Sequence, residues 1–103
     1  MSRYVYLVRF RSVLVKVGYS AKMVPSRQIS RYKTYYPDFS LLAYAHKTPK
    51  EFERYLKEQL SSYNIDGELF EPASFDTAVK LCERECNLIM DHRVAKPNND
   101  FLL

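Results

Sequence analysis

Residues 3–9, Arg-Tyr-Val-Tyr-Leu-Val-Arg, and residues 13–18, Val-Leu-Val-Lys-Val-Gly, decide the fold of this chain. Both segments are rich in β-branched and aromatic residues, a composition that is typical of strands. Because only a few residues separate them, we expect a tight antiparallel hairpin whose turn contains Arg11 and Ser12. Lys16 interrupts the second apolar segment and lies on the face opposite to Val15 and Val17.

Three helices and two more strands are predicted after the hairpin. They are a helix from Pro25 to about Tyr35, a strand over 39–45, a helix from Thr48 to about Tyr63, a short strand over 68–70 after an Asp66-Gly67 turn, and a helix from Ser74 with Ile89 on its apolar stripe. Thr48 and Glu51 have the spacing of a capping box around Pro49. We therefore expect an α+β fold, β-β-α-β-α-β-α, in which helices cover one face of a mostly antiparallel sheet of three to four strands.

The length of 103 residues favours one domain, which we place at residues 1–92, followed by a C-terminal tail at 93–103. Cys82 and Cys86 lie four residues apart in a helical pattern, without a CxxC pair, and are expected to be free thiols in a reducing compartment. The sequence contains neither a signal peptide nor an apolar segment of membrane-spanning length. We expect an intracellular protein, cytoplasmic or nuclear, without a membrane partner.

Charge is distributed unevenly along the chain. The net charge is +4, but residues 1–50 contain ten Lys and Arg against one acid, Asp38, whereas residues 51–103 contain six against eleven. A basic half of this kind suggests a surface for a polyanion, although the two halves need not be separate in space. Nucleic acid is therefore the favoured partner.

Four sequence features occur in a recognisable order. Tyr4-Val-Tyr6 lies in the first strand, Lys16-Val-Gly18-Tyr19 ends the second, Arg27 begins the first helix, and Glu53 lies in the second helix before Gly67-Glu-Leu-Phe70. This order resembles the GIY-YIG nuclease superfamily, especially its short branch in phages and large DNA viruses. The resemblance covers roughly residues 3–71 and implies a GIY-YIG-like fold, with a virus-encoded origin as one possibility.

The resemblance implies a set of site residues. Tyr6 would lie beside the attacking water as a candidate general base, and Lys16 takes the first position of the second motif. Gly18 would allow the chain to leave the sheet near the site. Arg27 would contact the scissile phosphate, and Glu53 would hold a single divalent metal ion, Mg²⁺ or Mn²⁺. Gly18, Tyr19, Arg31 and Lys33 are the further residues that we expect to contact the substrate.

The chain departs from the superfamily pattern at several positions. Tyr4 replaces the usual Gly of the first motif, Lys16 replaces the usual Tyr of the second, and Leu69 replaces a common aromatic residue. The interval between Gly18 and the helical arginine is about one residue longer than usual. Arg31, one turn after Arg27, is therefore an alternative phosphate-binding arginine.

These residue types suit phosphodiester hydrolysis, in which negative charge increases on the phosphate and on the leaving oxygen. A guanidinium binds two phosphate oxygens through its planar fork, and a carboxylate can hold Mg²⁺. A tyrosine is a poor base at its ordinary pKa of about 10. A nearby ammonium would lower this pKa, so Lys16 is expected either to activate Tyr6 or to bind phosphate.

The sequence predicts a metal-dependent endonuclease that acts on DNA, with RNA as an open alternative substrate. A non-catalytic nucleic-acid-binding module and an interaction protein that has lost the site are the rival interpretations. A homodimer or a protein partner could supply substrate specificity. For Glu68, at the turn before the short strand, we expect a structural function, and for His46 a surface position.

Overall fold

The computed structural model describes residues 3–11, 13–21, 23–34 and 38–93. Its strands are β1 (Tyr4–Phe10), β2 (Leu14–Ser20), β3 (Phe39–Ala45), β4 (Asn64–Asp66), β5 (Leu69–Phe70) and β6 (Asn87–His92). Its helices are α1 (Pro25–Lys33), α2 (Pro49–Gln59) and α3 (Ser74–Glu85), with a 3₁₀ turn at Ser61–Tyr63. The α+β class is confirmed, and the first three strands and first two helices begin within a residue of their predicted positions.

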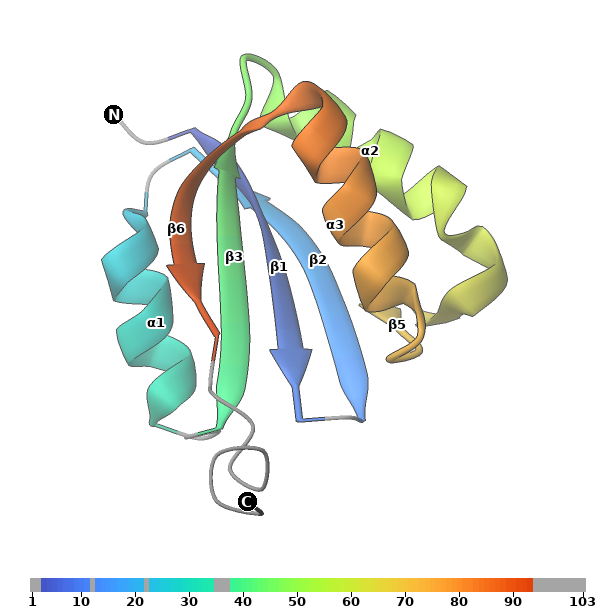
Figure 1. The fold of residues 1–103 in the computed structure, drawn as a ribbon, viewed down its shortest axis with the longest axis horizontal. Coiled ribbons are helices and arrows are strands. Elements are labelled where there is room, and N and C mark those ends of the chain that lie inside the picture. Colours follow the sequence, from blue (N-terminus) through green and yellow to red (C-terminus); the bar gives the residue numbers. More distant parts are fainter. Residues whose placement is uncertain (1–2, 12, 22, 35–37, 94–103) are drawn as a thin grey trace, which may run out of the picture.

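The predicted hairpin of β1 and β2 lies at the centre of one antiparallel sheet (Figure 1). The strand order is β4-β5-β2-β1-β3-β6, so the expectation of three to four strands is wrong, and the sheet has six. The Val13 N–H donates to the Phe10 carbonyl at 3.1 Å across the hairpin turn, where Arg11 has a positive φ of 56°. Ser12, the other predicted turn residue, lies outside the described residues.

The predicted third helix is too long. It ends at Glu85, because the Cys86 backbone is already extended and the residues that follow pair with β3 as the edge strand β6. Ile89 therefore belongs to a strand and is 46% exposed rather than buried on a helix. Three consecutive apolar residues, 88–90, fit either periodicity, and the pairing with β3 decides between them.

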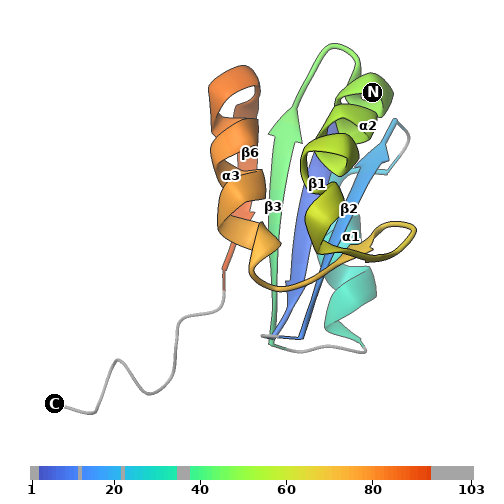
Figure 2. The same cartoon turned by 90° about the vertical axis from the view of Figure 1, so that its right-hand side faces the viewer.

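Helices cover both faces of the sheet, contrary to the expectation of one covered face. Figure 2 shows α1 on one side of the strands, with α2 and α3 on the other. The physical reason is that β1 and β3 are buried on both faces, so each face needs its own cover. Along β1, Tyr4, Tyr6 and Val8 face α1, whereas Val5 and Leu7 face α2 and α3.

Two cores result from this arrangement. The core beneath α2 and α3 contains Val5, Leu7, Val15, Val17, Leu42, Tyr44, Phe52, Leu56, Leu60, Phe70, Phe75, Ala78 and Cys82. The core beneath α1 is smaller and richer in tyrosine, and it contains Tyr4, Tyr6, Val8, Tyr32, Phe39, Leu41 and Ala43. The candidate site residue Tyr6 is thus part of the smaller core.

The start of α2 differs from prediction in one detail. Thr48 is the N-cap and Pro49 the first helical residue, but the Thr48 side chain makes no capping hydrogen bond, so the predicted capping box is wrong. Instead, the Thr48 N–H donates to His46 Nδ1 at 3.0 Å, and Thr48 Oγ1 lies 3.4 Å from the same nitrogen. The His46 and Phe52 rings stack with their centres 4.7 Å apart. This stacking holds His46 in position to interact with Thr48.

Three smaller expectations can be compared with the structure. Gly67 has a φ of 54°, which confirms the turn at Asp66-Gly67 and explains the use of glycine there. Cys82 and Cys86 are free thiols, as expected. None of the described helices combines the length and the apolar character that crossing a bilayer requires. The predicted tail lies outside the described residues, except for Arg93 at its start.

We predict that Leu56→Ala lowers the free energy of unfolding by about 2–5 kcal/mol, because it leaves a cavity between α2 and the sheet. Leu56 is fully buried, whereas Leu88 on β6 is 51% exposed, so Leu88→Ala is the matched control and should change stability by less than about 1 kcal/mol. Urea titration measures both variants. Equal losses would contradict the packing of α2 described above.

Candidate active site

The side chain of Tyr6 depends on the glycine opposite to it. In the β1–β2 register Tyr6 pairs with Gly18. A Cβ atom at position 18 would lie 2.5 Å from Tyr6 Cζ and 2.6 Å from Tyr6 Oη, distances that real Cβ atoms do not adopt. The phenol ring therefore lies across the Gly18 backbone. The expectation that the chain leaves the sheet at Gly18 is wrong, because β2 continues to Ser20. Gly18 instead makes room for the ring.

The hydroxyl of Tyr6 lies in a setting that keeps it protonated. Burial raises the pKa of Tyr6 well above its usual range, and Tyr32 and the negative charge of Glu68 raise it further. The positive charge of Arg31 acts in the opposite direction but does not outweigh burial. The expectation that Lys16 lowers the Tyr6 pKa is not met in this structure, because desolvation of the phenolate dominates.

Lys16 takes the predicted face of β2, beneath α1. Its side chain is only 24% exposed, and its Nζ lies 5.7 Å from the centre of the Tyr32 ring. The same ammonium is 3.9 Å from Glu68 Oε1. Lys16 is therefore half-buried between an aromatic ring and a carboxylate, rather than a solvated strand residue.

Lys16 belongs to a row of alternating charges that crosses from β2 to α2. Glu68 lies between two ammonium groups, with Lys57 Nζ 3.7 Å from Glu68 Oε2. Lys57 Nζ is also 3.4 Å from Glu53 Oε2. We call Lys16, Glu68, Lys57 and Glu53 the charge row. It connects the predicted metal-binding glutamate with the strand that carries the second motif.

Glu53 is buried, although it carries a charge. It is 7% exposed, so the i,i+4 pair with Lys57 is not an ordinary surface pair. Burial raises the pKa of Glu53, Lys57 lowers it in part, and Glu68 raises it again. A buried carboxylate that is only partly compensated is expected where a stronger cation can bind.

Helix α1 presents different residues to the sheet than the sequence suggested. Gln28 and Tyr32, one turn apart, are its buried residues, and the predicted residues Arg27 and Lys33 have exposed side chains. Arg31 is also exposed, but its guanidinium carbon lies 5.9 Å from the Tyr32 ring centre and its charge reaches Tyr6. The geometry thus favours Arg31 over Arg27 as the arginine beside the site.

Several polar side-chain atoms are buried next to Tyr6. Among the described residues, Tyr4 Oη, Gln28 Oε1 and Tyr32 Oη are buried without a hydrogen bond of standard geometry. Such atoms are uncommon in native interiors and are usually satisfied by water or a ligand. The interior beneath α1 is therefore polar enough to orient a water molecule near Tyr6.

The sequence interpretation missed three contributors to this region. From the sequence, no site function is expected for Tyr32 or Lys57, and a structural function is expected for Glu68. In the structure, Tyr32 interacts with both Tyr6 and Lys16, and Glu68 lies in the middle of the charge row. Glu68 directly precedes β5, in which Leu69 pairs with Lys16 of β2. This position next to the second motif is the sequence feature that could have identified Glu68.

Comparison of the chain with protein-family models, with curated proteins and with solved structures found no match in any of the three. Function therefore has to be inferred from the arrangement of Tyr6, Gly18 and the charge row. In chemical terms, the arrangement offers a phenol, two ammonium groups and two carboxylates at neighbouring strands and helices, together with an arginine.

We predict that Gly18→Ala lowers stability by about 1–3 kcal/mol, because the added methyl group displaces the Tyr6 ring. In a Tyr6→Leu background the clashing ring atoms are absent, so the same substitution should cost less. Urea unfolding of the four proteins gives the coupling energy, which we expect to be at least about 0.5 kcal/mol. Strictly additive effects would show that the ring does not lie over Gly18.

We also predict that Glu53→Gln stabilises the protein at pH 7 and that the gain shrinks as the pH falls. A carboxyl with a raised pKa binds its proton more tightly in the folded state, so its unfavourable charge is removed at acid pH and returns as the pH rises through the folded pKa. Thermal unfolding between pH 4 and pH 8 measures this difference.

The exposed Glu58 on the same helix provides the matched control, Glu58→Gln. Its stability relative to the parent protein should stay nearly constant over the same pH range. A stability gain for Glu53→Gln that grows towards acid pH would reverse the expected sign and contradict the buried charge.

Proposed function

We propose that this chain is a divalent-metal-dependent endonuclease that hydrolyses phosphodiester bonds in DNA. The observation that carries the proposal is the charge row, which links the buried carboxylate of Glu53 to the half-buried Lys16 and, through Glu68, to the electrostatic surroundings of Tyr6. The Glu53 carboxyl and the Tyr6 phenol are both buried, and the charge of Glu68 raises the pKa of each. Buried titratable groups with shifted pKa values are more typical of a reactive site than of a surface.

The residues present are compatible with one Mg²⁺ or Mn²⁺ ion. Glu53 and Glu68 already share one cation, the Lys57 ammonium, at 3.4 and 3.7 Å. Carboxylate oxygens are the ligands that Mg²⁺ prefers, and Mg²⁺ commonly keeps several waters when it binds one or two carboxylates. Within the described part of the chain, no group of three or more His, Cys, Asp and Glu side chains gathers, so Glu53 is the ligand that we assign. When bound, the ion would act as a Lewis acid on a phosphate oxygen.

The remaining chemistry belongs to the side chains of the protein. Tyr6 holds its proton at Oη in this structure and can therefore orient the attacking water by a hydrogen bond. For proton abstraction, its pKa must fall when further positive charge enters the site. Lys16 Nζ and the Arg31 guanidinium carbon lie 5.7 and 5.9 Å from the centre of the Tyr32 ring, so both offer positive charge to a phosphate held near this ring.

DNA is the proposed substrate because phosphates are the shared recognition element and the first half of the chain is strongly basic. RNA presents the same backbone charge, so the assay below includes both. The intracellular location expected from the sequence fits a nucleic-acid substrate, and it remains part of this proposal.

A non-catalytic nucleic-acid-binding module is the second candidate function. It is favoured by one observation: Lys57 satisfies both carboxylates of the charge row without a metal ion. In that case Lys57 would be a permanent neutralising group, and Glu53 would be structural.

We predict that the purified protein nicks supercoiled plasmid DNA with Mg²⁺ or Mn²⁺, and that Glu53→Gln lowers the rate at least about 100-fold. The reason is that the variant keeps the side-chain shape but loses the ligand charge. Glu58→Gln, on the exposed side of the same helix, should retain the parent rate. Gel electrophoresis over time, with a single-stranded RNA as a parallel substrate, measures both variants.

Equal nicking by Glu53→Gln and the parent protein would assign the activity to a contaminant or to another site. Binding to DNA without cleavage under all metals tested would favour the non-catalytic module instead.

A further inference from the structure

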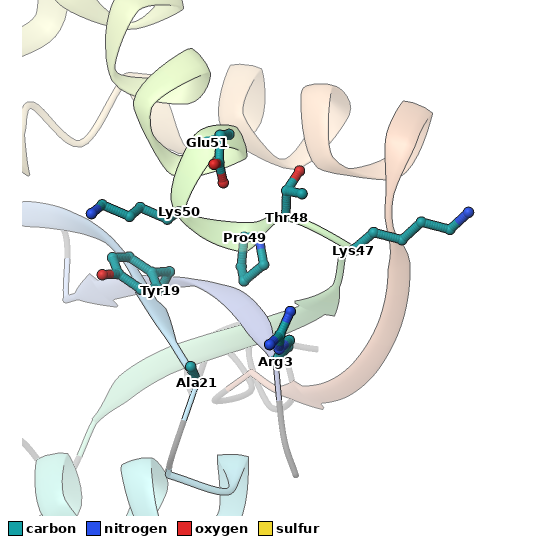
Figure 3. Close-up of a pocket in the computed structure, with 8 residues that line it drawn as sticks. All are labelled: Arg3, Tyr19, Ala21, Lys47, Thr48, Pro49, Lys50 and Glu51. Atoms are coloured by element: carbon teal, nitrogen blue, oxygen red, sulfur yellow. The ribbon is translucent and has the colours of Figure 1, made fainter.

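A second basic surface lies beside the proposed site, at the start of α2. It surrounds a hollow of about 260 Å³, and Figure 3 shows the side chains that line it. Arg3 comes from the start of β1, Lys47 from the segment between β3 and α2, and Lys50 from the first turn of α2. Tyr19, the last residue but one of β2, forms part of the wall. We call Arg3, Tyr19, Lys47 and Lys50 the basic groove.

The cations of the basic groove are available to a ligand. Arg3, Lys47 and Lys50 are exposed, and within the described ranges none of the three forms an ion pair. Glu51 is the single acid at the hollow, so the lining has an excess of positive charge. In Figure 3, the side chains of Lys47 and Lys50 extend in opposite directions from the start of α2. Cations that are spread apart suit a chain of phosphates better than one small anion.

Tyr19 adds an aromatic surface to these charges. It is 38% exposed, although it lies in a strand whose alternate neighbours Val15 and Val17 are fully buried. A neighbouring hollow of about 430 Å³ is lined by Tyr19, Ser20, Ala21 and Met23, so Tyr19 borders two hollows. An exposed aromatic ring among cations is the combination by which proteins hold single-stranded nucleic acid, because a free base can stack on the ring.

Two elements, β2 and α2, contribute residues to both the basic groove and the proposed site. Tyr19 directly follows Gly18, over which the Tyr6 ring lies. Lys50 precedes Glu53 by three residues on α2, so the two are neighbours along the helix surface. A nucleic-acid strand bound in the basic groove would therefore approach the charge row from the end of β2.

We propose that the basic groove binds the single-stranded segment of a nucleic-acid substrate next to the bond that is cut. The inference rests on the proposed nuclease function but makes a separate claim: the substrate contains an unpaired region. Arg3 and Lys50 bind its phosphates, and Tyr19 stacks on one of its bases.

The test is fluorescence anisotropy with a labelled 20-nucleotide DNA strand and the corresponding duplex, in EDTA to prevent cleavage. The parent protein should bind the single strand more tightly than the duplex. Arg3→Gln/Lys50→Gln should weaken single-strand binding about tenfold or more at low salt, and reduce the salt slope by about 1.4, since each phosphate contact contributes about 0.7. Tyr19→Leu should weaken it about fivefold or more without changing the salt slope.

Lys80→Gln/Arg84→Gln is the matched control, because it removes two exposed positive charges on α3, outside the basic groove. It should leave the salt slope unchanged.

Equal effects of the two double variants, or tighter binding of the duplex, would overturn the proposal even if plasmid cleavage were normal. If binding depends on the basic groove but the parent protein does not cleave, the proposed binding of single strands would stand and the proposed nuclease function would be refuted. Binding to phosphatidylserine vesicles but not to DNA, lost in Arg3→Gln/Lys50→Gln, would assign the groove to a membrane surface and overturn the proposal.

Discussion

The pairing of β1 with β2 on one side and β3 on the other is the constraint on which the rest of this molecule depends. It fixes which residues of β1 face α1 and which face α2 and α3. A shift by one residue would exchange the two faces, placing Val5 and Leu7 beneath α1 and Tyr6 beneath the other helices. The register also sets Tyr6 opposite Gly18, the one residue that leaves room for its ring.

Electrostatics then connects the strands with α2. The charge row alternates in sign, so each ammonium lowers the energy of the carboxylates beside it. This compensation is incomplete at Glu53, whose pKa is raised by burial. The protein thus keeps a carboxylate in a place that does not favour its charge, which is a cost to stability that a bound cation would reduce. Tyr6, also buried, keeps its proton for the same physical reason.

Local patterns predicted most of the fold. Segments rich in β-branched and aromatic residues located β1 and β2, a third apolar segment located β3, and Pro49 located the start of α2. Failures occurred where tertiary contacts decide. The short strand β4 has three exposed residues and no apolar alternation, so only its pairing with β5 identifies it. At residues 87–92, pairing with β3 outweighed a continued helical pattern.

Motif order pointed to Tyr6, Lys16, Gly18 and Glu53, and the structure places Tyr6 against Gly18 and joins Lys16 with Glu53 through the charge row. The motif does not fix the rotation of α1, because a change of one residue in spacing turns a side chain by about 100°. Sequence therefore left Arg27 and Arg31 as alternatives, and only the structure shows that Arg31 lies beside Tyr32 and that its charge acts on Tyr6.

Paramagnetic broadening by Mn²⁺ tests the central claim most directly, because it locates a bound ion without requiring activity. Substoichiometric Mn²⁺ added to ¹⁵N-labelled protein should broaden the amide signals of Glu53, Lys57 and Glu68, followed by those of Val17 and Gly18, and Glu53→Gln should abolish the effect. Broadening centred on other acidic residues, such as Glu83 and Glu85 of α3, or none at millimolar Mn²⁺, would contradict a metal-dependent site at Glu53.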